Sequence, residues 1–297
     1  MDERFRGLGV ALVTPFRPNG GIDYAGLGTL LEHQITNGVD YVVSMGTTGE
    51  SVTLTKAEKK QLLATTIELV RNRVPVVLGV GGNSTAEVVE TLAEFEMDGV
   101  DAILSVSPYY NKPTQEGIYQ HYKAIAQVCL RPIILYNVPG RTGSNMTAET
   151  TLRLARDFKN IIAIKEASAN LDQMGRILKH RPKDFMLISG DDALTLPIIA
   201  LGGEGVISVV GNALTSEFGA LVHAALKGDL ATARKEHLRL LELIDLLFVE
   251  GNPGGIKHVL KILGICDDTV RLPLVNISEG TAKKLYQALA DAEVVKL

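Results

Sequence analysis

Short apolar runs recur along the chain and alternate with segments of helical spacing. Eight runs rich in β-branched residues are bounded by Gly, Pro or Asn, and they begin at Leu8, Asp40, Pro75, Asp101, Pro132, Ile161, Phe185 and Gly205. Between them, segments such as 56–70 and 84–99 repeat apolar residues at helical intervals. Ser84, followed three positions later by Glu87, is a capping-box pattern for a helix start. Strands that are apolar on both faces and alternate with helices indicate a parallel sheet covered on both sides.

The number of strand-helix units selects the fold. Eight units predict a closed (β/α)8 TIM barrel of the α/β class. A doubly wound open sheet is the alternative, but no GxGxxG follows the first run, and GVGG at Gly79 is too short for that fingerprint. Strand patterns stop after about Lys227, and segments 231–248, 254–264 and 280–292 read as helices. We therefore expect a barrel with the catalytic face over residues 1–226 and a C-terminal helical appendage over 227–297.

Composition excludes several classes of partner. The 297 residues have 22% charged side chains and a formal net charge of −4, which is typical of a soluble globular protein and does not favour a nucleic-acid partner. Cys129 and Cys266 stand far apart without a CxxC, so neither a disulfide framework nor a zinc site is predicted. The first residues, MDERFRG, are charged where a signal peptide needs an apolar stretch, and no run approaches the length of a membrane span. We expect a cytoplasmic protein.

Polar and charged residues follow the predicted strands where a barrel of this kind places its chemistry. Catalytic groups of such barrels lie at the C-terminal ends of the strands. The corresponding segments here are GTTGE at 46–50, PYYN at 108–111, YNVPGRTG at 136–143, KE at 165–166 and SGDD at 189–192. Hydroxyls, tyrosines, one arginine and one lysine therefore converge on one face of the predicted barrel.

Lys165 is unusual because it ends an apolar run, IIAIKEAS at 161–168. Alternation along a strand places Ala163, Lys165 and Ala167 on one face, which we assign to the barrel interior, and Ile162, Ile164 and Glu166 on the other. A buried ammonium is costly unless it is paired or loses its proton. The functional interpretation is a neutral amine that attacks a ketone to form a Schiff base. The structural alternative is a lysine that pairs with a carboxylate such as Asp191, or one that extends to the rim.

Other strand-end residues suit the same chemistry. Tyr136 carries a phenol that can relay protons, although packing at the barrel mouth explains it equally well. Thr47 and Thr48 stand between glycines, where hydroxyls and backbone N–H groups can hold a carboxylate, but such turns are common. Arg141 follows Pro139-Gly140 and can bind a carboxylate through two hydrogen bonds, with a surface ion pair as the alternative.

Metal and serine-hydrolase chemistry are not favoured. The six histidines form no HxH, HxxxH or histidine-carboxylate cluster at a strand end, so a metal-dependent aldolase or hydrolase has no support. No GxSxG nucleophile elbow is present. We expect an enzyme without a metal or an organic cofactor.

Taken together and in order, the motifs resemble those of the dihydrodipicolinate synthase family. The similarity covers essentially the whole chain and rests on GTTGES at 46–51, SPYYNKPTQEGIYQHY at 107–122, LYNVPGRTG at 135–143, IKEAS at 164–168, SGDD at 189–192, GVISV at 205–209, NPGGIKHVL at 252–260 and RLPL at 271–274, with a departure just after Pro253. The resemblance implies a pyruvate-dependent class I aldolase. Its reaction condenses pyruvate with L-aspartate 4-semialdehyde to give 4-hydroxy-tetrahydrodipicolinate, the committed step of diaminopimelate and lysine biosynthesis.

The resemblance also implies roles for individual residues. Lys165 matches the Schiff-base lysine and Tyr136 the general acid/base. Thr47 matches the hydroxyl that links this tyrosine to Tyr110, which in the family reaches in from the neighbouring subunit. The matched substrate-binding positions are Thr48 for the pyruvate carboxylate, Arg141 for the semialdehyde carboxylate, and Gly190 and Ile207 for backbone that lines the pocket. We expect a homotetramer built as a dimer of dimers.

Two other functions stay open from the sequence. A lyase for N-acetylneuraminate or a 2-keto-3-deoxy sugar acid shares the lysine and the tyrosine, but Arg141 in PGRTG resembles those enzymes less. A barrel that has kept the lysine as a binding or regulatory protein is the second alternative. The presence of Thr47, Tyr110, Tyr136 and Lys165 together argues against it.

Regulation is a separate expectation. Many members of the family are inhibited by lysine at a dimer interface, and the matching positions here are Ser51, Val52, Lys56, Lys59, Asn83, Glu87 and Tyr109. Lys56 and Lys59 put two cations beside a ligand with two ammonium groups, where sensitive relatives more often have histidine. We therefore expect weak or absent feedback by lysine, with a solvated helix start as the alternative role of the two lysines.

Overall fold

The computed structural model describes residues 2–295, and its centre is a closed barrel of eight parallel strands. Each strand pairs with the next in chain order, and β8 closes the barrel on β1. The strands are β1 (Gly7–Ala11), β2 (Tyr41–Ser44), β3 (Val76–Gly79), β4 (Ala102–Val106), β5 (Ile133–Asn137), β6 (Ile161–Glu166), β7 (Met186–Ser189) and β8 (Gly205–Ser208). Each of the eight predicted runs corresponds to one strand, although β1 begins one residue before its run, and the predicted (β/α)8 barrel is confirmed.

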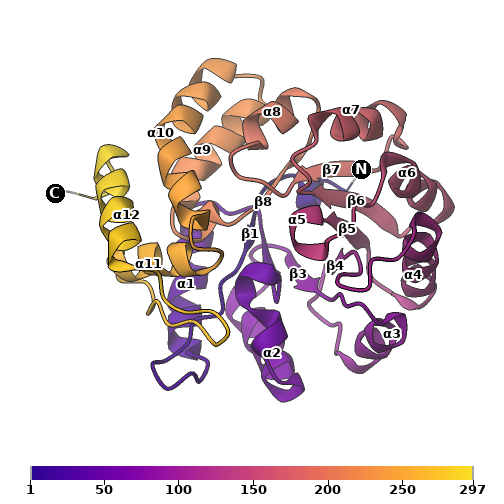
Figure 1. Ribbon diagram of the computed structural model, residues 1–297, viewed down its shortest axis with the longest axis horizontal. Helices are drawn as coiled ribbons and strands as arrows, with labels where there is room; N and C mark the ends of the chain where they lie inside the picture. Colours follow the sequence, from indigo (N-terminus) through magenta and orange to yellow (C-terminus); the bar gives the residue numbers. More distant parts are fainter. Residues whose placement is uncertain (1, 296–297) are drawn as a thin grey trace.

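Helices surround this barrel (Figure 1). They are α1 (Tyr24–Thr36), α2 (Lys56–Val70), α3 (Thr85–Glu94), α4 (Gln115–Val128), α5 (Pro139–Thr142), α6 (Ala148–Asp157), α7 (Leu171–His180), α8 (Thr195–Ala200), α9 (Thr215–Leu226), α10 (Leu230–Phe248), α11 (Gly254–Ile262) and α12 (Glu279–Asp291). Short 3-10 turns also occur at Glu3–Phe5 (η1), Thr47–Gly49 (η2), Ser51–Thr53 (η3) and Val210–Asn212 (η4). The three helices predicted after residue 227 correspond to α10, α11 and α12, which confirms the C-terminal helical appendage.

Helix starts follow the capping residues. Thr55 and Glu58 form a complete capping box at the start of α2, because each side chain bonds the backbone of the other. At α3, Ser84 Oγ accepts a 3.4 Å hydrogen bond from the backbone N–H of Glu87, which is one half of the predicted pair. This helix ends at Glu94, earlier than the predicted residue 99.

Alternate strand residues fill the barrel interior. They include Tyr41, Val43, Val77, Ile134, Tyr136, Ala163, Met186, Ile188 and Ile207, and Phe5 from η1 packs on Tyr41 edge to face with the ring centroids 5.7 Å apart. Gly9 makes room for this packing, because a Cβ atom there would lie 2.2 Å from the Tyr41 ring. Ala163 lies in this interior cluster, so the interior face of β6 is assigned correctly.

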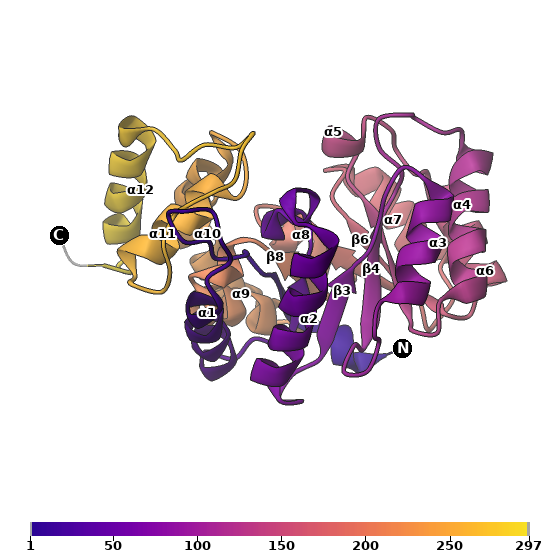
Figure 2. The same ribbon diagram turned by 90° about the horizontal axis from the view of Figure 1, so that it is seen from below.

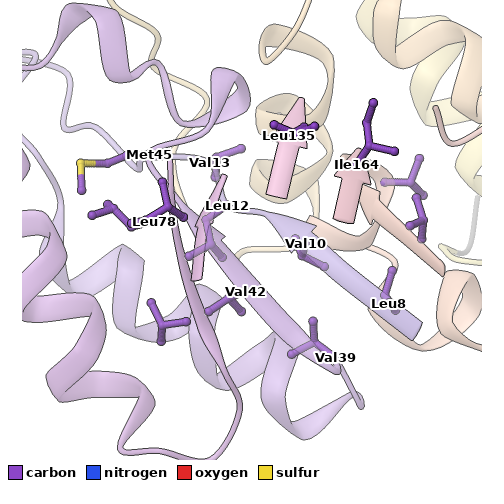
Figure 3. Packing of buried hydrophobic residues seen from close by; sticks show 14 of the residues in the cluster. Leu8, Val10, Leu12, Val13, Val39, Val42, Met45, Leu78, Leu135 and Ile164 are labelled. Atoms are coloured by element: carbon purple, nitrogen blue, oxygen red, sulfur yellow. The ribbon is translucent and has the colours of Figure 1, made fainter. Parts of the chain in front are cut away.

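The opposite faces of the strands pack against the helices (Figure 3). Leu8 and Val10 of β1, Val42, Leu78, Leu135 and Ile164 belong to this outer layer of the core. Ile162 was expected in the same layer, but it packs against the interior cluster. The register of β5 and β6 shifts at this point, so the pairing moves from Ile161 directly to Ala163 and the simple alternation does not extend to the start of β6.

The C-terminal appendage is anchored to the barrel by a buried ion pair. Figure 2 shows α11 and α12 on the opposite side of the molecule from α3, α4 and α6. The side chain of Lys257, on α11, is fully buried, and its Nζ lies 2.6 Å from Glu50 Oε1 and 2.8 Å from the Thr269 carbonyl oxygen. Glu50 Oε2 accepts a 2.9 Å hydrogen bond from the backbone N–H of Arg271. The appendage therefore binds the loop after β2 through Glu50. A domain boundary at residue 227 stays a prediction.

Within residues 2–295, no helix combines the length and the apolar character that a bilayer-spanning segment needs.

The buried ion pair generates a stability prediction. Substitution of Lys257 by Met leaves the Glu50 carboxylate buried without its cation, so we expect the free energy of unfolding to fall by about 3–5 kcal/mol in urea denaturation. Lys261→Met is the matched control, because Lys261 is half-exposed in its ion pair with Asp268, and its loss should cost less than about 1 kcal/mol. Equal losses in the two variants would contradict this account of the appendage.

Candidate active site

Lys165 and Tyr136 meet at the C-terminal end of the barrel. They are paired in register on β6 and β5, and both side chains point into the interior, with 5% and 7% of their surface exposed. Lys165 Nζ lies 4.4 Å from the centre of the Tyr136 ring. This arrangement places a buried amine beside the ring of a buried tyrosine.

The structural alternatives for Lys165 do not hold. Within residues 2–295, no carboxylate lies in ion-pair range of its Nζ, and its low exposure excludes extension to the rim. Asp191 is engaged elsewhere, because its Oδ1 accepts hydrogen bonds from the backbone N–H groups of Ala193 and Leu194. A buried, unpaired lysine is a costly arrangement, which is typical of a functional site.

Small residues leave space around the lysine. A Cβ atom at Gly190 would lie 2.8 Å from Ala167 Cβ and 3.1 Å from both Cγ and Cε of Lys165. The backbone N–H of Gly190 donates a 2.8 Å hydrogen bond to the Glu166 carbonyl, which fixes this close approach. Ile207, on β8, lines the same interior and is 1% exposed.

The loop of residues 46–50, which we call the threonine loop, follows β2 at the point where the C-terminal appendage contacts the barrel. Thr48 is buried, and its Oγ1 accepts a 2.9 Å hydrogen bond from Asn252 Nδ2. This leaves the hydroxyl proton of Thr48 free to be donated to a substrate oxygen. Thr47, one residue earlier, is exposed. The loop ends at Glu50, which has a left-handed backbone with φ of 51° and is held by Lys257.

Tyr110 and Arg141 lie at the surface of the chain. Tyr110 is 87% exposed, with a left-handed φ of 71°, and its backbone N–H donates to the Thr142 carbonyl. Arg141, on α5, is exposed, and its guanidinium has no ion pair within residues 2–295. The structure thus brings Lys165, Tyr136 and Gly190 into contact, while Tyr110 and Arg141 stand outside this buried group.

The predicted regulatory positions are spread over neighbouring elements. Lys56 begins α2 and forms an ion pair with Glu94, at the end of α3. Asn83 precedes α3, and its carbonyl accepts a 2.9 Å hydrogen bond from Asn111 Nδ2. The remaining members lie on η3 (Ser51 and Val52), on α2 (Lys59), on α3 (Glu87) and after β4 (Tyr109). The ion pair with Glu94 reduces the uncompensated positive charge that we expected at Lys56.

Sequence reasoning missed several polar residues that support the site. Asn252, Glu50 and Lys257 gave no local signal, because their partners are more than 200 positions away along the chain. Glu166 did give a signal, since a carboxylate on the outer face of an apolar strand must be buried under helices. It is fully buried, and this burial raises its pKa, whereas hydrogen bonds from Gln173, Ser168 and Asn137 lower it.

Metal ligation has no support in the described part of the chain. Residues 2–295 contain no group of three or more histidine, cysteine, aspartate or glutamate side chains placed to hold a metal ion.

Comparisons with known proteins identify the family of this chain. The model of the dihydrodipicolinate synthetase family matches residues 4–292. The 4-hydroxy-tetrahydrodipicolinate synthase of Parabacteroides distasonis is 53% identical over 293 residues, which is 99% of each chain. The dihydrodipicolinate synthase structure from Thermotoga maritima is 41% identical, with a TM-score of 0.96 and coverage of 98% of this chain and 100% of its own.

A further relative was solved with lysine bound. This dihydrodipicolinate synthase from Cyanidioschyzon merolae is 42% identical, with a TM-score of 0.95, and the match covers 98% of this chain and 99% of its own. The identity, the coverage and the shared fold extend over nearly the whole chain. The chain therefore belongs to the dihydrodipicolinate synthetase family.

Proposed function

We propose that this chain is a lyase that condenses pyruvate with L-aspartate 4-semialdehyde through a Schiff base on Lys165, giving 4-hydroxy-tetrahydrodipicolinate. The names of its close relatives support this reaction, which belongs to diaminopimelate and lysine biosynthesis. The observation that carries the residue assignment is the buried Lys165 amine, which lies against the Tyr136 ring with no carboxylate partner in residues 2–295. No cofactor is needed, since the protonated imine formed between Lys165 and pyruvate is itself the electron sink.

The first steps use the lysine and the tyrosine. Lys165 Nζ attacks the keto carbon of pyruvate, and the carbinolamine loses water to give a protonated imine. Loss of a proton from the methyl carbon then gives an enamine, whose carbon attacks the semialdehyde aldehyde. Tyr136 is adjacent to Nζ and relays protons in these steps. The substrate amine finally attacks the imine carbon, closes the ring and releases Lys165.

The other residues hold the substrates in this scheme. The Thr48 hydroxyl donates to the pyruvate carboxylate. Its proton is available for this because Thr48 Oγ1 acts as the acceptor in the hydrogen bond from Asn252. The exposed guanidinium of Arg141 receives the semialdehyde carboxylate. Backbone at Gly190 and Ile207 lines the pocket around the imine.

Oligomerisation completes the site in this proposal. The phenol of Tyr110 extends into a neighbouring subunit, where it joins Thr47 and Tyr136 in a proton relay, and two such dimers form a homotetramer. The 87% exposure of Tyr110, together with that of Thr47, supports this assignment. We also propose that the enzyme acts in the cytoplasm.

A sugar-acid lyase is the competing function within this chemistry. It would share Lys165 and Tyr136 but bind a polyol in place of the semialdehyde carboxylate. Arg141 on an exposed turn favours the carboxylate substrate, because a guanidinium binds a carboxylate through two charge-assisted hydrogen bonds. Kinetic comparison of L-aspartate 4-semialdehyde with N-acetylneuraminate and 2-keto-3-deoxygluconate separates the two functions.

The Schiff base is tested by trapping. Borohydride reduction in the presence of pyruvate should leave a pyruvate-derived adduct on Lys165, detected by peptide mass spectrometry, and Lys165→Ala should abolish it. Lys159→Ala, an exposed lysine just before β6, is the matched control and should retain the adduct. An unmodified Lys165 in the parent protein would return this residue to a structural role.

Gly190 generates a second prediction. Gly190→Ala places a methyl group against Ala167 and the Lys165 side chain, so we expect Schiff-base formation to slow by about 10- to 100-fold. The measurement is the rate of borohydride-trappable adduct in a single turnover. Gly175→Ala, on α7, meets no atom within 4 Å and should leave this rate unchanged. Equal rates in the two variants would show that Lys165 does not need this space.

Feedback by lysine is the third prediction. We propose that Ser51, Val52, Lys56, Lys59, Asn83, Glu87 and Tyr109 form a weak lysine site, and the relative solved with lysine bound supports a site in the family. Steady-state assays should show little inhibition by submillimolar lysine, because Lys59 repels the ammonium groups of the ligand. Lys56→His combined with Lys59→His should increase the inhibition. Strong inhibition of the parent enzyme would contradict the proposal.

A further inference from the structure

A buried carboxylate lies directly behind the catalytic strand. Glu166 Oε1 accepts hydrogen bonds from Ser168 N at 2.9 Å and Asn137 Nδ2 at 3.1 Å, and Oε2 accepts from Gln173 Nε2 at 2.8 Å and Asn137 Nδ2 at 3.2 Å. Within residues 2–295, no lysine, arginine or histidine forms an ion pair with it. The charge of Glu166 is therefore held by neutral hydrogen-bond donors and by no cation within the described part of the chain.

The same network reaches the loop that follows Arg141. Asn137 Nδ2 donates to Asn145 Oδ1 at 2.8 Å, and Asn137 Oδ1 accepts from the backbone N–H of Met146 at 3.0 Å. Asn145 Nδ2 in turn donates to Gln173 Oε1 at 2.9 Å. The network thus joins the ends of β5 and β6, the loop after α5 and the start of α7.

The directions of these hydrogen bonds favour the ionised carboxylate, against the effect of burial. N–H groups of Asn137, Ser168 and Gln173 donate to both carboxylate oxygens, so a proton on either oxygen would face one of these donors. An amide at this position would likewise aim its NH2 group at the donors of Asn137 or Gln173. A buried polar group without a hydrogen-bond partner is costly, so we expect the network to rearrange when one donor faces another.

The register of the two strands connects this network to the site. Asn137 pairs with Glu166 one position after Tyr136 pairs with Lys165. Since side chains alternate along a strand, the first pair faces the helices and the second faces the barrel interior. The two pairs share the same backbone, so a shift of the outer pair moves the inner one.

We propose that Glu166 and Asn137 are positioning residues, which hold Lys165 and Tyr136 at the separation that Schiff-base formation needs. The inference rests on the proposed function and adds to it residues that do not touch the substrate. It predicts an effect on the rate of imine formation and not on stability alone.

The test is Glu166→Gln with single-turnover trapping by pyruvate and borohydride. We expect the trapping rate to fall about 100-fold, since a small misplacement of reacting groups has an effect of this size. Glu204→Gln is the matched control, because Glu204 is also a buried carboxylate, bound by Leu187 N and Arg181, at the opposite end of the barrel. It should lower the melting temperature and leave the trapping rate within about twofold of the parent.

A compensating variant separates the network from the charge at position 166. In Glu166→Gln combined with Gln173→Glu, the new amide can donate to the new carboxylate, which restores the hydrogen bond between these two side chains but loses the one from Gln173 Nε2 to the Met146 carbonyl. We expect this double variant to recover at least tenfold of the lost trapping rate. If Glu166→Gln does not fold, Asn145→Ala replaces it as the test, because it is a milder change at a half-buried residue of the same network. We expect Asn145→Ala to slow trapping several-fold.

Three results would overturn the inference. The first is trapping at the parental rate in Glu166→Gln, or in Asn145→Ala, with only the melting temperature reduced as in Glu204→Gln. The second is a double variant that regains stability but traps pyruvate as slowly as Glu166→Gln. This result would assign the slower trapping to the lost charge at position 166. The third is a parent enzyme without an adduct on Lys165, which removes the proposed function and this inference with it.

Discussion

The hydrogen-bonded register between β5 and β6 is the constraint on which the site depends. It pairs Tyr136 with Lys165 and, one residue later, Asn137 with Glu166. Because neighbouring side chains on a strand point to opposite faces, the same backbone register positions one pair in the interior and the other in the outer layer. The amine and the phenol are placed in the barrel, while amides and a carboxylate bind each other beneath the helices. In the proposed mechanism, a barrel strand thus supports its own Schiff-base lysine from its outer face.

Burial of polar groups recurs wherever the site needs a fixed loop. Lys257 and Glu50 hold the threonine loop from the appendage, and Asn252 bonds Thr48 directly. Such pairs gain little net stability, since desolvation offsets most of their attraction, but they tolerate few alternative arrangements. The C-terminal helices thus do more than cover the barrel. They determine where the loop after β2 ends and which way the Thr48 hydroxyl can point.

Lys165 contrasts with these groups because it has room but no ionic partner in residues 2–295. Ala167 and Gly190 leave space along its chain, and the Tyr136 ring covers its amine. A fold selected for stability alone would pair this charge or replace it with an apolar side chain. The uncompensated amine supports the proposed Schiff-base role of Lys165.

The sequence by itself determined the eight strands, the C-terminal helices and the interior face of Lys165, because these depend on local alternation and on motifs that are continuous in the chain. Only the tertiary structure decided that Asn252 meets Thr48 and that Lys257 meets Glu50, because no periodic signal joins residues more than 200 positions apart. It also decided the exception at Ile162, where the register shift between β5 and β6 overrides alternation. Local patterns report which face of an element is apolar, whereas the partner of a buried polar group depends on how distant elements pack.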